Sequence, residues 1–193
     1  FLGFQINEGE YKVMGLASYG NSNSSLAKEV ANLIKWNKEE RKIILDMSYF
    51  SFHISAKDSY NEKLSSLIGD PRNPFVKLQI NDTNFQNYAD IARGAQDAVV
   101  KILTEIFNLA YSLTGIKDFL FSGGVAMNSS SIEKIAALPF VNEIVIPPSP
   151  GDAGAAIGAG YYAFIKNNPK KVSKLNKPSL FPTVINNSSL HKG

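Results

Sequence analysis

The chain has 193 residues, of which 44% are hydrophobic, and it can therefore bury one sizeable core in a single globular domain. The 20 Lys and Arg residues against 17 Asp and Glu leave a net charge of only +3, so composition does not predict a basic face for nucleic acid. There is no cysteine, which excludes disulfides, thiolate nucleophiles and thiolate metal sites.

The elements expected in the first part of the chain are short. Residues 1–20 predict a short helix and a loop, and residues 24–36 predict a helix, because apolar residues recur there every three or four positions. Two β-rich runs at 42–47 and 49–54 favour a hairpin or two successive edge strands. A short helix near 60–68 lies in an otherwise irregular stretch, which we interpret as an insertion.

The strongest periodic signal is an apolar stripe over residues 84–114, which predicts a long core helix that ends at Gly115. The elements expected after it are a strand at 119–121, a helix at 130–138, a strand at 143–146 and a helix at 153–164. This alternation predicts an α/β fold in which a mixed, partly parallel sheet is covered by helices. From residue 167 the composition shifts to Asn, Pro, Lys and Ser, so residues 167–193 are expected to be a linker or tail.

Both strand-to-helix turns are candidate ligand sites, because ligands of open α/β sheets bind at the carboxyl ends of strands. In the first turn, Gly123 and Gly124 let backbone approach a flat or phosphorylated ligand, and Asn128 could add a directed amide hydrogen bond. A tight connection that needs positive φ explains the two glycines equally well.

The second turn places Asp152 before a helix, where capping of the helix is the commoner role by spacing alone. The helix that follows contains Gly154, Gly158 and Gly160, and glycine costs up to about 1 kcal/mol per helix position relative to alanine. Its sequence therefore predicts a close approach, either by another helix or by a ligand.

Complete metal sites and common hydrolase motifs are absent from the sequence. His53 lies in an apolar run, where a hydrogen-bonded structural histidine is favoured over a ligand, and His191 lies in the tail. No His-x-x-x-His or Glu-x-x-His cluster, Walker loop or Gly-x-Ser-x-Gly elbow occurs. No apolar run reaches the length of about 20 residues that spans a bilayer, and no secretory signal is evident, so we expect a cytoplasmic protein.

Three motifs then occur in a fixed order: GEYKVMGLASYG at 9–20, FSGGVAMN at 121–128 and PGDAGAAIGA at 150–159. Together they resemble the NodU/CmcH family of O-carbamoyltransferases, over about residues 1–166. The resemblance implies an actin-like ATPase (ribonuclease H-like) fold, with this chain as the second lobe of the threonylcarbamoyl-synthase-like N-terminal domain. Residues 167–193 would then lead toward a YrdC-like domain that this chain lacks.

The family resemblance also implies an activity. The YrdC-like domain would make carbamoyl-adenylate from carbamoyl phosphate and ATP, and the actin-like domain would transfer the carbamoyl group to a hydroxyl of an acceptor. The chain begins at Phe1 within an apolar stretch, so we expect it to be a piece of a longer protein that is inactive without its first lobe and its YrdC-like domain.

The site residues follow from the same resemblance. Asp152 matches the aspartate that binds a divalent metal, expected to be iron, together with two histidines of the first lobe. Gly123, Gly124, Val125 and Asn128 match the turn that lies against the adenylate. Lys12 and Tyr19 lie in the first motif and are candidates for a catalytic role without an assigned function.

Several positions depart from the family pattern. Met127 and Ser129 stand where leucine and cysteine are more usual, and Ser18 replaces a frequent proline. Residues 58–84 match no motif of the family. These departures concern packing more than the assignment.

Three alternatives stay open at this point. A tRNA threonylcarbamoyladenosine synthase shares the fold and the metal aspartate, but would lack the motif at 9–20 in this form and would carry a more basic surface. A non-catalytic nucleotide-binding module would keep the fold and the Gly-Gly turn. The bare inter-lobe face of such a piece could also drive self-association. Neither a membrane nor a nucleic acid is an expected partner.

Overall fold

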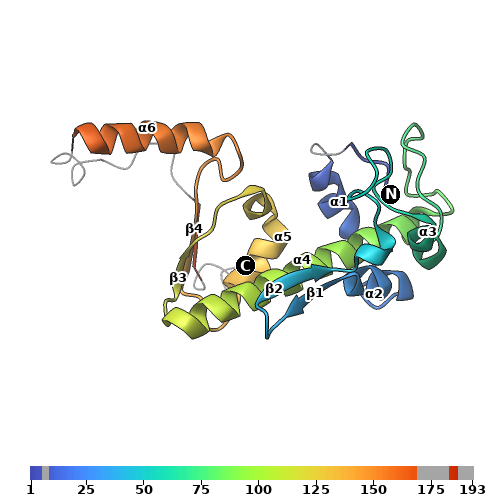
Figure 1. Ribbon diagram of the computed structural model, residues 1–193, viewed down its shortest axis with the longest axis horizontal. Coiled ribbons are helices and arrows are strands. Elements are labelled where there is room, and N and C mark those ends of the chain that lie inside the picture. Colours follow the sequence, from blue (N-terminus) through green and yellow to red (C-terminus); the bar gives the residue numbers. More distant parts are fainter. Residues whose placement is uncertain (6–8, 169–182, 187–193) are drawn as a thin grey trace. The chain divides into compact units, whose positions relative to one another are not determined.

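The longest element is α4 (Phe85–Thr114), which confirms the long helix that the apolar stripe predicts (Figure 1). In the computed structural model, residues 1–5 and 9–168 are described, as is the backbone of residues 183–186. The chain divides into two units, Phe1–Ile106 and Phe107–Gly193, and each is described by itself. Among the described residues, no helix combines the length and apolar character needed to cross a membrane.

The first unit is built around the N-terminal part of α4. Its other elements are α1 (Glu10–Ala17), α2 (Ser25–Asn32), β1 (Ile34–Asn37), β2 (Lys42–Leu45), the 3-10 helix η1 (Met47–Tyr49) and α3 (Glu62–Ile68). α1 buries Leu16 and Ala17 against Phe85, Ala89 and Ala92 of α4. In a second cluster, Leu64 and Ile68 of α3 pack with Leu33, which follows α2, and with Ile91 of α4.

The predicted helix over residues 24–36 is too long. α2 ends at Asn32, and β1 pairs antiparallel with β2, from Ile34 opposite Leu45 to Asn37 opposite Lys42. The apolar spacing of residues 30–36 suits a helix as well as a strand, and pairing with β2 decides between them. The hairpin therefore forms one element earlier than the sequence predicts.

The predicted strand at residues 49–54 is wrong. η1 occupies the start of this stretch, and the remaining pairing is a single bridge between Phe50 and Tyr60. The Asp46 carboxylate caps η1 by accepting a hydrogen bond from the Ser48 N–H at 3.1 Å, and this turns the chain away from an extended path. His53 is exposed and lies edge-on to Phe52, so the interpretation of His53 as a structural histidine in an apolar strand is wrong too.

The second unit holds a three-stranded sheet in the order β3–β4–β5. Its elements after α4 are β3 (Asp118–Leu120), the 3-10 helix η2 (Gly124–Met127), α5 (Ser129–Ala136), β4 (Glu143–Ile146), α6 (Gly154–Asn167) and β5 (Thr183–Asn186). β3 and β4 are parallel, and β5 is antiparallel to β4, which confirms the predicted mixed sheet.

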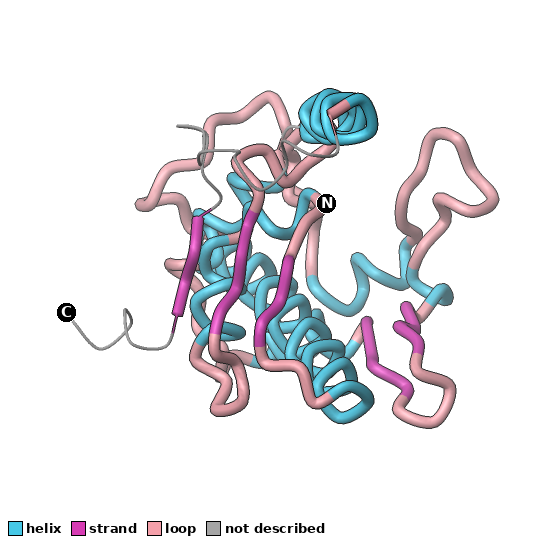
Figure 2. Tube along the Cα trace, turned by 90° about the vertical axis from the view of Figure 1, so that its left-hand side faces the viewer, coloured by secondary structure: helices cyan, strands magenta, loops and turns pink. Residues whose placement is uncertain are grey.

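Helices lie on one face of this sheet (Figure 2). The C-terminal part of α4 contributes Phe107, whose ring centroid is 4.8 Å from that of Phe119 and 5.6 Å from that of Phe121. Ile135 of α5 and Ile144 of β4 are both fully buried. α6 lies beyond the end of β4 and has no buried residue, so the helical cover of the sheet is less complete than predicted (Figure 1).

The segment that the sequence predicts to be a linker or tail contains one strand of the sheet. β5 pairs with β4 from Asn186 opposite Glu143 to Thr183 opposite Ile146. Apart from this strand, Asn167 and Asn168, residues 167–193 lie outside the described residues, and His191 is among those left out. The division into a domain at 1–166 and a tail at 167–193 stays a prediction.

Candidate functional site

The two strand-to-helix turns that the sequence singles out lie side by side in the second unit. The carbonyl oxygen of Pro150 accepts hydrogen bonds from the Gly123 N–H at 2.7 Å and from the Ser122 Oγ at 3.2 Å. The turns follow β3 and β4, which are parallel neighbours, so their carboxyl ends meet at one edge of the sheet. One carbonyl thus ties the Gly-Gly turn to the loop that carries Asp152.

Gly123 has a conformation that only glycine adopts readily, with φ at 108° and ψ at 163°. This accounts for the first glycine as a turn requirement. Gly124 has no positive φ, and a Cβ added at either glycine would meet no atom within 4 Å. The outer side of this turn is therefore open, and no other part of the described chain requires the second glycine.

Asn128 caps α5. Its Oδ1 accepts a hydrogen bond from the Ser131 N–H at 3.1 Å, and Ser131 is completely buried. Helix starts leave such N–H groups without partners inside the helix, and an Asn at this position is among the best caps. The side-chain oxygen of Asn128 is thus already used within the chain, a role that the motif does not predict.

Asp152 does not cap the helix that follows it. The N-cap residue of α6 is Ala153, without a side-chain hydrogen bond, and Asp152 contributes only its backbone oxygen, which accepts from the Ala155 N–H at 3.2 Å. Within residues 1–5 and 9–168, no hydrogen bond or ion pair engages the exposed Asp152 carboxylate. The capping role favoured by spacing is therefore wrong, and the carboxylate is available to a ligand.

The glycines of α6 differ in what they require. A Cβ at Gly154 would lie only 2.0 Å from the Ser149 backbone oxygen, so this glycine lets the loop close against the helix start. At Gly158 and Gly160 a Cβ would meet nothing within 4 Å. The predicted close approach to α6 is thus present at its first turn and is not made at the later glycines by any described residue.

Lys12 and Tyr19 belong to the first unit, and both are exposed. The Lys12 Nζ lies 5.7 Å from the ring centroid of Tyr11. Tyr19 is 55% exposed while its ring edge packs on Phe85, with centroids 5.5 Å apart and planes at 80°. The motif at 9–20 thus buries Leu16 and Ala17 in the core, while Lys12 and Tyr19 stay exposed.

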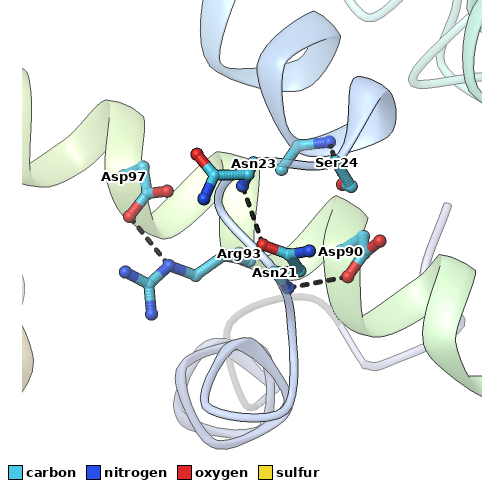
Figure 3. Close-up of polar contacts among 7 residues, drawn as sticks. Asn21, Asn23, Ser24, Asp90, Arg93 and Asp97 are labelled. Atoms are coloured by element: carbon cyan, nitrogen blue, oxygen red, sulfur yellow. Dashed lines mark hydrogen bonds and ion pairs between the residues drawn. The ribbon is translucent and has the colours of Figure 1, made fainter.

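A polar network around the buried Asp90, which holds the end of this motif, has no counterpart in the predicted site; Figure 3 shows its Asn21–Asp90 bond. The carboxylate of Asp90, a residue only 7% exposed, accepts hydrogen bonds from the Asn21 N–H at 2.8 Å and from the Gln86 Nε2 at 2.7 Å. Gln86 and Asp90 are four residues apart on α4, next to its apolar stripe. The signal in the sequence is the spacing of Gln86 and Asp90, which places two polar residues on one face of the helix beside its apolar stripe.

The described residues do not form a metal site on their own. No three His, Asp or Glu side chains gather in the part of the chain that the structure describes. A metal bound at Asp152 would therefore need ligands beyond the described residues, and the metal role of Asp152 stays a prediction.

Comparison with protein families decides the assignment. The family model of the carbamoyltransferase N-terminus matches residues 1–161. The chain belongs to this carbamoyltransferase family. The resemblance to NodU/CmcH carbamoyltransferases that the three motifs carry is thereby confirmed at the level of the family.

Individual relatives agree in extent with the family match. The uncharacterized protein sll1178 of Synechocystis is 31% identical over 175 residues, covering 86% of this chain and 26% of the relative. The uncharacterized protein MJ1058 of Methanocaldococcus jannaschii is 31% identical over 159 residues, covering 82% of this chain and 23% of the relative. The nodulation protein NolNO of Sinorhizobium fredii is 26% identical over 162 residues, covering 82% and 20%. The chain thus spans about a quarter or less of the length of these relatives.

Proposed function

We propose that this chain is the second lobe of an actin-like domain that transfers a carbamoyl group from carbamoyl-adenylate to a hydroxyl of an acceptor molecule. Membership of the carbamoyltransferase family supports the reaction class. The observation that carries the site assignment is the exposed carboxylate of Asp152, which does not cap α6. The loop that carries it is tied to the open Gly-Gly turn through the Pro150 carbonyl.

The proposed reaction is an acyl-type transfer. The acceptor oxygen forms a bond to the carbamoyl carbon, the bond from that carbon to the phosphate oxygen of the adenylate breaks, and AMP leaves with the electron pair. The acceptor hydroxyl releases its proton to water. YrdC-like chemistry outside this chain would supply the adenylate from carbamoyl phosphate and ATP.

In this proposal the Gly-Gly turn receives the nucleotide. Since a Cβ at Gly123 or Gly124 would meet nothing in the chain, the backbone here is open to a flat or phosphorylated group. Val125, 48% exposed, adds an apolar surface beside it. Asn128, whose oxygen caps α5, stays a candidate contact to the nucleotide. Lys12 and Tyr19 stay candidates for a catalytic role on the first unit.

The donor chemistry of Asp152 fits one position of a divalent metal site, with iron as the expected metal. Carboxylate oxygens are common ligands of such metals, and this one is neither capped nor paired within the described residues. When bound, the metal would polarise the carbamoyl carbonyl as a Lewis acid. Asp152 itself would hold one coordination position and contribute negative charge beside the nucleotide turn.

The test uses the full-length protein with ATP, carbamoyl phosphate and a panel of hydroxyl acceptors. Asp152→Ala is expected to lose bound metal and to lower carbamoyl transfer at least about 100-fold, since even outer-shell changes cost 10- to 100-fold. Formation of the adenylate, measured as release of pyrophosphate, is expected to persist. Asp70→Ala, which removes another exposed aspartate, is the matched control and is expected to keep both metal and transfer.

Two results would contradict the proposal. If Asp152→Ala keeps its metal and its transfer activity, Asp152 is not a ligand. If the wild-type protein binds ATP but transfers no carbamoyl group to any acceptor, the non-catalytic nucleotide-binding alternative gains the support instead.

A further inference from the structure

We infer that Asp90 is a positioning residue for the carbamoyltransfer reaction, because it fixes the end of the motif that carries Lys12 and Tyr19. This inference rests on the proposed function, because the reaction that Asp90 would support is the proposed carbamoyl transfer. Asp90 itself touches neither the substrate nor the metal of that proposal. Three separate features of the first unit lead to it.

The first feature is the carboxylate itself. Asp90 is 7% exposed, yet no cation pairs with it within the described residues: Arg93, less than one turn along α4, is bound to Asp97 at 2.9 Å. A buried carboxylate is costly unless its hydrogen bonds compensate, and an apolar residue would fill the same space at lower cost. What this carboxylate provides is a strong, charge-assisted acceptor.

The second feature is what the carboxylate holds. Its Oδ1 accepts from the backbone N–H of Asn21 at 2.8 Å (Figure 3). The same oxygen accepts from the Gln86 Nε2 at 2.7 Å, and that Nε2 also donates to the Tyr19 backbone oxygen at 3.2 Å. The backbone on both sides of Gly20 is therefore tied to α4. Because these bonds engage backbone groups, they fix the path of the chain rather than the identity of a side chain.

The third feature is the close approach at Gly20. A Cβ at this position would lie 2.2 Å from the Ala89 backbone oxygen and 2.5 Å from the Arg93 Cβ. The chain thus lies directly on the surface of α4 at the point where Asp90 and Gln86 hold it. Tyr19 is the residue just before this contact, and its exposed ring leans on Phe85 of the same helix.

These contacts have a consequence for the exposed side of α1. On its inner side, α1 packs Leu16 and Ala17 against α4 through apolar contacts, which have no preferred direction. The directional hydrogen bonds of Asp90 and Gln86 hold the backbone of residues 19–21, which follows α1 and from which the Tyr19 ring extends. Loss of a supporting contact typically misplaces such groups enough to slow a reaction, even where the fold survives.

The experiment measures carbamoyl transfer and Asn21 amide exchange in the full-length protein. Asp90→Ala is expected to speed hydrogen exchange of the Asn21 amide and to lower kcat/KM at least tenfold. Asp90→Asn is expected to restore kcat/KM to within about threefold of wild type, because its Oδ1 accepts the same two hydrogen bonds. Gln86→Met, at an exposed position, tests the network if Asp90→Ala does not fold, and is expected to lower kcat/KM about threefold.

Asn61→Ala is the matched control for a loss of stability alone. Asn61 caps α3 by accepting a hydrogen bond from the Lys63 N–H, far in sequence from the motif at 9–20. Its variant is expected to lower Tm while leaving kcat/KM and the exchange of the Asn21 amide as in wild type.

The outcomes separate the two proposals. An active wild-type protein in which folded Asp90→Ala, or Gln86→Met, keeps its kcat/KM overturns the positioning role alone. Unchanged exchange of the Asn21 amide in Asp90→Ala overturns it as well. A wild-type protein that transfers no carbamoyl group overturns the proposed function and this inference with it.

Discussion

Substitution of Asn128 separates two roles that fall on one side chain. Asn128→Ala removes the oxygen that accepts from the Ser131 N–H, and that N–H belongs to a residue with no exposed surface. Loss of such a cap costs about 1 kcal/mol, within a range of about 0.5–2 kcal/mol. Asn128→Ser keeps an acceptor oxygen at the same place and is expected to cost only a few tenths of a kcal/mol.

The stability difference is read from thermal unfolding of the chain by far-UV circular dichroism. For a chain of this size, about 1 kcal/mol corresponds to a fall in Tm of about 2–4 °C, which is expected for Asn128→Ala. For Asn128→Ser, the Tm is expected to fall by less than about 1 °C. Asn128→Asp should match or exceed wild type, because a negative charge at a helix N-terminus adds about 0.3–1 kcal/mol.

Nucleotide binding by the same variants tests the amide nitrogen. Titration calorimetry of the full-length protein with ATP is expected to show a two- to tenfold weaker Kd for both Asn128→Ser and Asn128→Ala, the value of one lost hydrogen bond of about 0.5–1.5 kcal/mol. If Asn128→Ser unfolds as early as Asn128→Ala, the capping argument is refuted. If Asn128→Ser binds ATP as wild type does, the amide has no part in binding.

Three further predictions concern single positions. Gly20→Ala is expected to lower the free energy of unfolding by about 1–3 kcal/mol in urea titrations, because its Cβ would meet the Ala89 backbone oxygen at 2.2 Å. Gly15→Ala, at an open position of α1, is the control and is expected to raise the free energy of unfolding by up to about 1 kcal/mol. Equal effects of the two substitutions would contradict this reasoning. Ile135→Ala, at a fully buried position, is expected to cost about 2–5 kcal/mol in the same assay, and a loss below 1 kcal/mol would show that α5 is not packed on the sheet. The hydrogen bonds from Ser48 hold the pKa of Asp46 in the folded chain below its ordinary value. The ionised carboxylate therefore stabilises the fold above about pH 4, the ordinary pKa of an aspartate, and this stabilisation is lost as the pH falls from there through the pKa of the folded state. A carboxyl resonance of Asp46 that titrates at the ordinary value in NMR would refute that reasoning.

Some features of the candidate site were open to prediction because they depend on short stretches of sequence. Two consecutive glycines after an apolar strand indicate a special turn, and Gly123 does adopt a glycine-specific conformation. The order of strands and helices from β3 to α6 follows from local periodicity in the same way, whereas β5 lies in the segment predicted to be a linker or tail. The role of Asp152 was not predictable by spacing, because whether an aspartate caps a helix depends on the path of the preceding loop, and here that loop is tied to Gly123 through Pro150.

The sequence by itself determined the long helix α4, the alternation of strands and helices, and the three motifs that indicate the carbamoyltransferase family. Each of these rests on a local pattern, either a period of 3.6 residues or a run of specific residue types. Only the tertiary structure decided that residues 34–37 form a strand and that Asp90 holds Asn21, a residue 69 positions away. The physical reason is that strand pairing and buried hydrogen bonds join groups that are distant along the chain, and packing alone determines which of them meet.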